Sequence, residues 1–186
     1  MIYLLDTSAL VRLLRDPKLQ EVWYDAIDAE AIGSCYPQRA EFLYSARNAA
    51  EYDEIAEMFG DLYPDVAVPK TTGRWVSSVQ YQMSRAGHHR SASAVDLIIA
   101  ATAAHHGLTV LHDDADYHTV AQHAPDLGEQ NIHDLALPTA REPRAEGRSL
   151  GEIIREQREG GRRPPNRVNR ADDGNRTRMT SLEERS

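Results

Sequence analysis

Four acidic residues stand beside segments of the chain that can form strands or helices. They are Asp6, Glu41, Asp96 and Asp114. Asp6, Asp96 and Asp114 fall where a parallel α/β fold places its ligands, at the carboxyl ends of strands and the starts of the following helices. Carboxylate oxygens suit Mg²⁺ or Mn²⁺, and no Cys or His accompanies them at the spacing of a zinc site. We therefore expect one divalent-metal site.

A metal ion held by carboxylates fits the hydrolysis of a phosphodiester bond. That reaction needs a water aimed at phosphorus, relief of charge on the non-bridging oxygens and stabilisation of the departing oxygen, and Mg²⁺ meets all three needs. Without a cation, gathered carboxylates repel one another and raise one another's pKa. A bound cation also turns an acidic pocket into one that attracts phosphate.

Each acid also has a structural explanation that needs no metal. Asp6 can cap a helix, and Asp96 stands where a capping box opened by Ser93 places its acid. Glu41 can be a solvated helix residue, and Asp114 can belong to a turn with its acidic neighbours. The joint occurrence of the four acids, in this order around expected strands, favours the metal site.

Apolar patterns along the chain alternate between those of strands and those of helices. The runs 2–5 and 108–111 are too short for helices and fit strands buried on both faces. Further strands are expected at 31–35, at 66–68 and around Ile132, and helices at 6–16, 18–29, 37–46, 49–62, 75–87, 97–106 and 117–123. Strands separated by helices imply right-handed crossovers. We expect a three-layer α/β/α fold with a central parallel sheet.

The chain divides into two parts of different composition. Residues 1–138 hold 9 of the 21 basic and 20 of the 29 acidic residues, whereas 139–186 hold 12 Arg, 9 acidic residues and few large apolar side chains. We expect one folded domain over 1–138 and an Arg-rich, mostly disordered tail over 139–186. The acidic first part repels a polyanion, so a nucleic-acid role needs a bound cation or a local basic strip.

The single cysteine and the short apolar runs indicate where the protein works. Cys35 alone excludes an intrachain disulfide framework and suits a reducing compartment. No basic segment precedes a long apolar run at the start, and no run approaches the roughly 18 residues that span a bilayer. We expect a cytoplasmic protein with no membrane segment.

The surroundings of the four acids resemble the PIN domain, and specifically the VapC-type toxins of bacterial toxin–antitoxin pairs. The resemblance rests on LLDTSAL at 4–10, Glu41 on a helix, AVDLIIAATA at 94–103 and GLTVLHDDADY at 107–117. The first and third blocks are specific only when taken together. The resemblance covers residues 1–138 and leaves the tail outside.

This resemblance implies a Mg²⁺-dependent endoribonuclease that forms a homodimer, with Mn²⁺ as an alternative ion. A VapB-type antitoxin would inhibit it by filling the acidic groove with its C-terminal segment. Carried over to this sequence, Asp6 and Asp96 are the principal metal ligands. Glu41 and Asp114 complete the site directly or through water, and Asp116 matches a further acidic position of the closing motif.

Neighbouring polar residues support these roles. Thr7 or Ser8 supplies a hydroxyl that steadies Asp6. Family members usually carry Thr or Ser where His112 stands, so the hydrogen bonding around the ligands is expected to differ here. The polar segment His88-His89-Arg90 is typical of a solvated loop. The alternative is that these residues contact RNA phosphates ahead of Asp96.

Two other classes of function compete with a nuclease. A PIN-like module can bind RNA or an antitoxin without cutting. A receiver-type signalling domain also gathers carboxylates and Mg²⁺, but it needs an acidic pair after the first strand and a lysine after a late strand. Asp6 has no acidic neighbour, and the only lysines, Lys18 and Lys70, precede expected helices.

Overall fold

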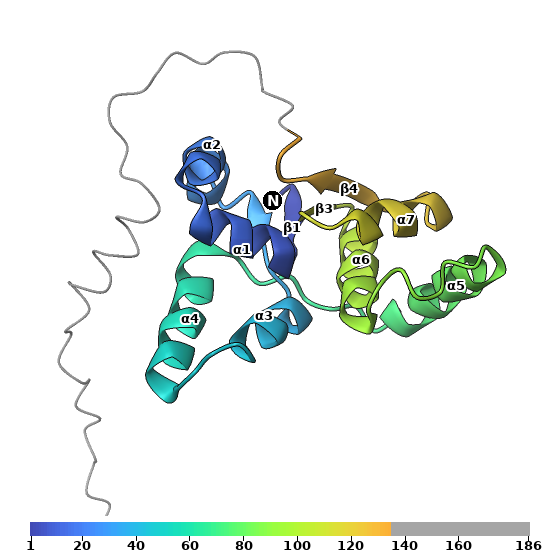
Figure 1. The fold of residues 1–186 in the computed structure, drawn as a ribbon, viewed down its shortest axis with the longest axis horizontal. Helices are drawn as coiled ribbons and strands as arrows, with labels where there is room; N and C mark the ends of the chain where they lie inside the picture. The colour runs from blue at the N-terminus through green and yellow to red at the C-terminus, as the bar shows by residue number, and fades with distance from the viewer. Residues whose placement is uncertain (135–186) are drawn as a thin grey trace, which may run out of the picture.

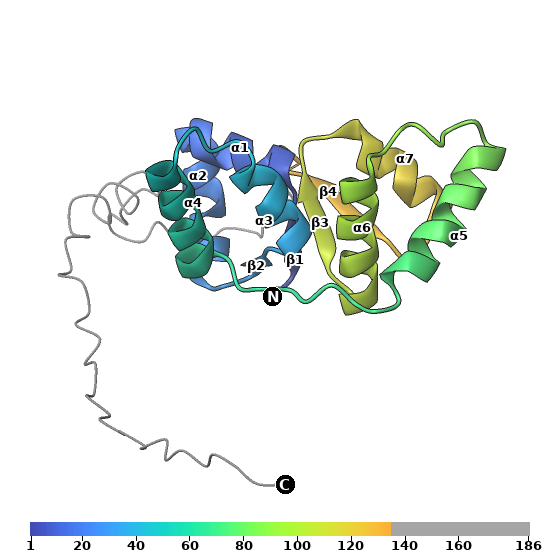
Figure 2. The ribbon, with the colours of Figure 1, turned by 90° about the horizontal axis from the view of Figure 1, so that it is seen from below.

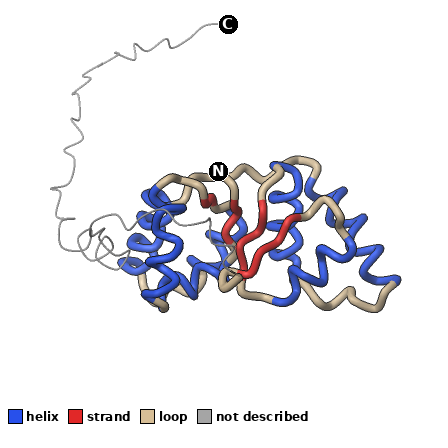
Figure 3. The backbone as a smooth tube through the Cα atoms, turned by 90° about the horizontal axis from the view of Figure 1, so that it is seen from above, coloured by secondary structure: helices blue, strands red, loops and turns tan. Residues whose placement is uncertain are grey.

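A four-stranded parallel sheet separates two helical layers in this computed structural model, which describes residues 1–134 (Figures 1 and 2). The strands are β1 (Tyr3–Leu5), β2 (Ile32–Gly33), β3 (Thr109–His112) and β4 (Gly128–Asn131). Their order is β2-β1-β3-β4, and every neighbouring pair is parallel. Figure 3 shows the strands side by side between the helices. The expected α/β/α fold with a central parallel sheet is confirmed.

Successive residues of the central strands pack into two separate hydrophobic cores, one on each face of the sheet. Leu4 and Leu5 are both fully buried, and strand geometry points them to opposite faces of the sheet. Leu4 and Val110 belong to one core, whereas Leu5 and Leu111 belong to the other. This is why the first strand is a continuous apolar run rather than an alternating one.

Each face of the sheet has its own helices. The core around Leu5 is closed by α1 (Thr7–Arg15), α2 (Pro17–Asp28) and α4 (Ala49–Leu62). The core around Leu4 is closed by α5 (Thr72–Arg85), α6 (Ala94–His106) and α7 (Ala115–His123). Figure 2 shows these two sets on opposite sides of the strands. The short α3 (Tyr36–Leu43) contacts α1, α4 and α6.

Local sequence signals fix the ends of α6, the most deeply buried helix. Ser93 accepts the backbone N–H of Asp96, and the Asp96 side chain accepts the N–H of Ser93, so the expected capping box is present. The helix ends at Gly107, whose φ of 65° is left-handed and suits glycine. The capping box holds Asp96 in the first turn of this helix.

The strand expected at 66–68 is wrong. This segment makes only an isolated parallel bridge, between Ser34 and Asp65, with Val66 donating its N–H to the Ser34 carbonyl at 2.8 Å. Pro64 and Pro69 flank the segment and have no N–H to donate, so the ladder does not extend. Val66 is nevertheless buried, which explains the apolar pattern.

Some expectations concern residues beyond this part of the chain. The Arg-rich tail and the domain limit at 138 lie outside the described residues and stay predictions. Among the helices of residues 1–134, none is long and apolar enough to cross a membrane.

Candidate active site

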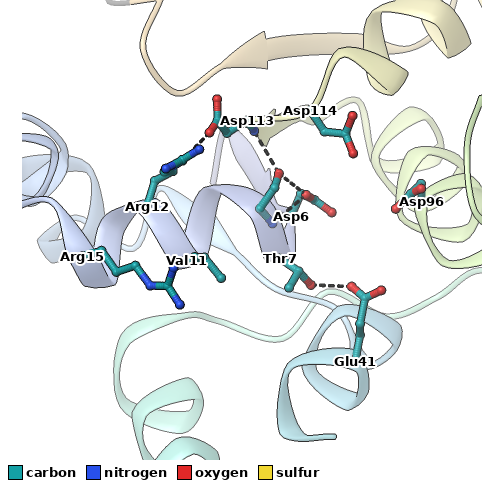
Figure 4. A pocket seen from close by; sticks show the side chains of 10 residues that line it. Asp6, Thr7, Val11, Arg12, Arg15, Glu41, Asp96, Asp113 and Asp114 are labelled. Atoms are coloured by element: carbon teal, nitrogen blue, oxygen red, sulfur yellow. Dashed lines mark hydrogen bonds and ion pairs between the residues drawn. The ribbon is translucent and has the colours of Figure 1, made fainter. Parts of the chain in front are cut away.

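The carboxyl ends of β1 and β3 open into a pocket of about 400 Å³. It is lined by Asp6, Thr7, Ser8, Val11, Arg12, Arg15, Glu41, Asp96, Asp113 and Asp114 (Figure 4). All four acids proposed from the sequence are therefore brought together. Asp6 follows β1 and Asp114 follows β3, but Asp96 comes from α6, which follows a loop rather than a strand.

Asp6 is the most firmly held of these carboxylates, with only 4% of the residue exposed. Its backbone N–H donates to the Leu111 carbonyl at 3.0 Å, which ties the end of β1 to β3. One carboxylate oxygen accepts the backbone N–H and the hydroxyl of Ser8, and the other accepts the hydroxyl of Tyr117 at 2.9 Å. Asp6 thus caps α1 and lines the pocket at the same time.

Tyr117 is a positioning residue that the sequence did not reveal. Burial, followed by the charges of Asp6 and Asp96, holds the pKa of its phenol well above the usual value. The phenol therefore keeps its proton and remains a donor to Asp6. No local signal marks this tyrosine, because its partner lies 111 positions away in the sequence.

The two hydroxyl residues after Asp6 have separate partners. The Ser8 hydroxyl donates to Asp6 and accepts the backbone N–H of Asp113 at 2.9 Å, linking the loops that follow β1 and β3. The Thr7 hydroxyl instead donates to Glu41 at 2.6 Å. Of the two hydroxyls considered for Asp6, Ser8 makes the contact and Thr7 orients the carboxylate from α3.

Asp114 caps a helix, Asp96 lies in the first turn of another, and both line the pocket. Asp114 caps α7 by accepting the backbone N–H of Asp116 at 2.9 Å, and Asp96 accepts that of Ser93 at 2.7 Å. Burial, then the charges of Asp114 and Asp96, raise the pKa of Asp116. Asp96 and Asp114 therefore both stabilise helix ends and contribute negative charge to the pocket. Asp116 lies close enough to both for their charges to act on its carboxyl group.

The donor set fits a hard divalent cation. Carboxylate oxygens from four elements line a pocket that is open to solvent on one side, which leaves room for water and phosphate as further ligands. Within residues 1–134, no three His, Cys, Asp or Glu side chains are gathered closely enough to hold a metal ion as they stand. The carboxylates share a pocket without forming a closed cage.

His112 makes the contact that a hydroxyl at its position could make. Its ring is buried, and Nδ1 accepts the backbone N–H of Asp114 at 3.1 Å. The proton of the neutral ring must then sit on Nε2, which donates to Glu129 at 2.8 Å. The ring also packs against Tyr117, with 4.9 Å between centroids. His112 therefore connects the backbone of Asp114 with the tyrosine that holds Asp6.

Two arginines on α1 line the other side of the pocket, and the sequence had not singled them out. Arg12 forms an ion pair with Asp113, and Arg15 lies one turn further along α1. Burial acts to raise the pKa of Asp113, but Arg12, with Asn131 and His133, outweighs it and lowers the pKa. Asp113, one of the acidic neighbours of Asp114 in the expected turn, thus holds Arg12 in an ion pair.

The loop that precedes α6 does not line the pocket. In this loop, His88 Nδ1 lies 3.0 Å from Nε2 of His123 on α7. Contact of His88, His89 and Arg90 with RNA stays a prediction. Lys18 and Lys70 do not line the pocket either, so the receiver-type alternative lacks its lysine there.

Comparison with known proteins identifies the family of this chain. The family model of the PIN domain matches residues 3–122, which include all four acids. The chain belongs to the PIN domain family. Ribonuclease VapC6 of Mycobacterium tuberculosis is 58% identical over 97 residues, which cover 52% of this chain and 76% of that protein. Ribonuclease VapC18 of the same organism is 37% identical over 123 residues, 65% of this chain and 88% of that protein.

Solved structures agree on the fold of this PIN domain. VapBC2 from Rickettsia felis, bound to a DNA fragment from its promoter, superposes with a TM-score of 0.57 at 17% identity, covering 70% of this chain and 98% of that one. FitAcB from Neisseria gonorrhoeae gives 0.55 at 21% identity, covering 72% and 100%. The PIN-like fold and the resemblance to VapC-type proteins, both inferred from sequence, are confirmed.

Proposed function

We propose that this PIN domain is a Mg²⁺-dependent endoribonuclease, the toxin of a toxin–antitoxin pair, which hydrolyses RNA phosphodiester bonds by metal-activated water. One observation carries the proposal: four acids from four separate parts of the chain line one open pocket, and they are Asp6, Glu41, Asp96 and Asp114. Relatives named as VapC ribonucleases support it. Mn²⁺ can replace Mg²⁺, since both take oxygen ligands.

The chain's own residues position the four carboxylates. Ser8 and Tyr117 fix Asp6, and Thr7 orients Glu41. His112 holds the backbone of Asp114, and the backbone N–H of Ser93 donates to the Asp96 carboxylate. Asp6 and Asp96 are proposed as the principal ligands, with Glu41 and Asp114 completing the set and Asp116 as a further oxygen donor. When bound, Mg²⁺ supplies an activated water and neutralises charge on the phosphate.

The proposal extends to partners and location. Solved complexes with the same fold are VapBC toxin–antitoxin pairs, which supports a VapB-type antitoxin as the partner of this chain. The antitoxin's C-terminal segment would cover the acidic pocket and exclude RNA. The homodimer and the cytoplasmic location belong to the same proposal. The homodimer follows from the family resemblance, and the location follows from the single Cys35, which suits a reducing compartment.

Cleavage of RNA tests the proposal directly. The full-length protein is incubated with a panel of RNAs in Mg²⁺, in Mn²⁺ and in EDTA. We expect cleavage only with metal, leaving 5′-phosphate and 3′-hydroxyl ends. Asp6→Ala and Asp96→Asn should each lower the rate by at least about 100-fold, a transition-state loss of roughly 3 kcal/mol.

A matched control and a second measurement separate the alternatives. Asp28→Asn removes the same charge at the exposed end of α2, outside the pocket, and should leave the rate unchanged. Mg²⁺ should also raise the thermal unfolding midpoint of the wild type but not of Asp96→Asn, because only the wild type binds the ion tightly. Cleavage at an unchanged rate in EDTA contradicts the proposal. Tight RNA binding without turnover in any metal would instead indicate a non-cutting module.

A further inference from the structure

One face of α1 gives the acidic pocket a basic wall. Ser8, Val11, Arg12 and Arg15 all line the pocket, and their spacing of three, four and seven residues places them on one side of a helix. Figure 4 shows Arg12 and Arg15 along α1, with Glu41 and Asp96 across the pocket. The basic wall is defined here as Arg12 and Arg15.

Both guanidinium groups have donors left for a ligand. The Arg12 side chain is 55% exposed, and only its Nε contacts Asp113. A guanidinium has five N–H donors, so four remain. Arg15 is exposed, and its side chain makes no hydrogen bond or ion pair with any of residues 1–134. Asp113 also restrains Arg12, which lowers the entropy lost when Arg12 binds a ligand.

The charge of the molecule makes these two arginines significant. The first 138 residues carry 20 acidic against 9 basic residues, so a polyanion is repelled from most of this surface. Of those basic residues, only Arg12 and Arg15 line the pocket. Arginine pairs well with phosphate oxygens, because its planar fork of donors matches them in geometry as well as charge.

We propose that Arg12 and Arg15 bind backbone phosphates of single-stranded RNA next to the scissile phosphate, and so set where the strand lies along the pocket. This inference rests on the proposed ribonuclease function. Phosphate contacts position a nucleic acid without reading its sequence. The basic wall therefore contributes to binding of all RNA substrates alike, while the carboxylates across the pocket carry out the cleavage.

Steady-state kinetics of the full-length protein test this assignment. KM and kcat are measured on a single-stranded RNA over a range of salt concentrations for Arg15→Gln, Arg12→Gln and the double variant. Each single change should raise KM about fivefold and leave kcat within about twofold. The slope of log KM against log salt should fall by about 0.7 for each arginine, the value for single strands. Arg74→Gln removes the same charge on α5, away from the pocket, and should behave like the wild type.

Several outcomes would overturn the assignment. The assignment is wrong if Arg15→Gln and the double variant have the same KM and the same salt slope as the wild type. Another such outcome is an equal effect in Arg74→Gln, because that would show a general charge effect. A loss of antitoxin binding with unchanged RNA kinetics would assign the wall to the antitoxin instead. Thermal unfolding checks that Arg12→Gln, which loses its contact with Asp113, is still folded.

Failure of the proposed function is distinguishable from failure of this inference. If the wild type cuts no RNA, the ribonuclease proposal is wrong, and the basic wall is then tested by equilibrium binding. Fluorescence anisotropy of the same labelled RNA in Mg²⁺ should show weaker binding and a lower salt slope for the arginine variants. Identical binding by wild type and double variant would contradict the inference on its own.

Discussion

His112 fills the place of a hydroxyl with a ring that makes two directed hydrogen bonds. A Thr or Ser side chain can accept the N–H two residues later, and the His112 ring does the same for Asp114 through Nδ1. The ring adds a second bond, from Nε2 to Glu129, which a hydroxyl cannot reach at the same time. The His112 ring thus supplies an acceptor for the Asp114 N–H and also bonds β3 to Glu129 of β4.

We predict that His112→Ala lowers kcat at saturating Mg²⁺ by about tenfold, because residues that orient metal ligands typically affect activity by that much or more. His112→Thr restores an acceptor for the Asp114 N–H and should retain more activity than the alanine variant. His105→Ala, at the exposed end of α6, is the control and should leave kcat unchanged. Equal activity of the alanine and threonine variants would contradict a role in orienting Asp114.

The sequence revealed residues with local signals and missed residues whose role depends on tertiary placement. Asp6 and Asp114 cap helices, and Asp96 belongs to a capping box, so their positions could be predicted from local patterns. The ion pair of Arg12 with Asp113 joins residues 101 positions apart. No spacing rule links such residues until the order of the strands is known.

At the scale of elements, the end of each helix was predictable where the chain carries a capping or stop signal. The helix expected at 49–62 is α4 with the same limits, capped by Asn48. The segment 66–68 has the apolar pattern of a buried strand, but it forms no ladder, because its flanking prolines cannot donate hydrogen bonds. Such a short apolar run predicts that its side chains are buried, but it does not predict that its backbone joins a sheet.

The cap of α6 allows a test at this scale. Ser93→Ala removes the side-chain oxygen that accepts the Asp96 N–H at 3.1 Å, and it should lower the free energy of unfolding by about 1 kcal/mol. Ser93→Thr keeps a capping hydroxyl and should be close to the wild type. Because the Ser93 backbone still donates to the Asp96 side chain, kcat should change little. Denaturant unfolding measures the effect, and equal stability of all three proteins would refute it.

Glu129 on β4 bonds to His112 on β3 and to His118 on α7, so we expect this contact to depend on pH. Burial acts to raise the pKa of Glu129, but hydrogen bonds from His112 and His118 outweigh it and lower the pKa. A carboxyl whose pKa is lower in the folded state stabilises the fold above its unfolded pKa of about 4.3. That stability is lost as the pH falls through the folded pKa.

We therefore predict that Glu129→Gln lowers the free energy of unfolding by about 1 kcal/mol at pH 7. The difference from the wild type should shrink below about pH 4, where the wild-type carboxyl is protonated as well. Urea unfolding at several pH values measures it. Glu57→Gln on the exposed side of α4 is the control and should match the wild type throughout. A difference that does not vary with pH would show that charge is not the cause.

At the scale of the whole molecule, strand order brings two of the four pocket acids together, and α3 and α6 add Glu41 and Asp96. β1 and β3 are neighbours although more than a hundred residues separate them, so Asp6 and Asp114 emerge at the same edge. The alternation of strand and helix patterns predicted a parallel sheet, because parallel strands need crossovers, but it did not predict which strands are neighbours. The arginines across the pocket could not be foreseen, since composition shows only that residues 1–138 are acidic.

The division of the chain at 138 gives the last prediction. All ten pocket residues precede position 115, and the family match ends at 122. Ile132, which directly follows β4, is fully buried and would be kept by a cut at 138. A protein ending at Pro138 should therefore keep its thermal unfolding midpoint and its kcat. Residues 139–186 carry 12 Arg against 9 acidic residues, so their removal should change the salt dependence of KM far less than Arg15→Gln does. Lost activity or solubility on truncation would instead give these residues a role in the working protein.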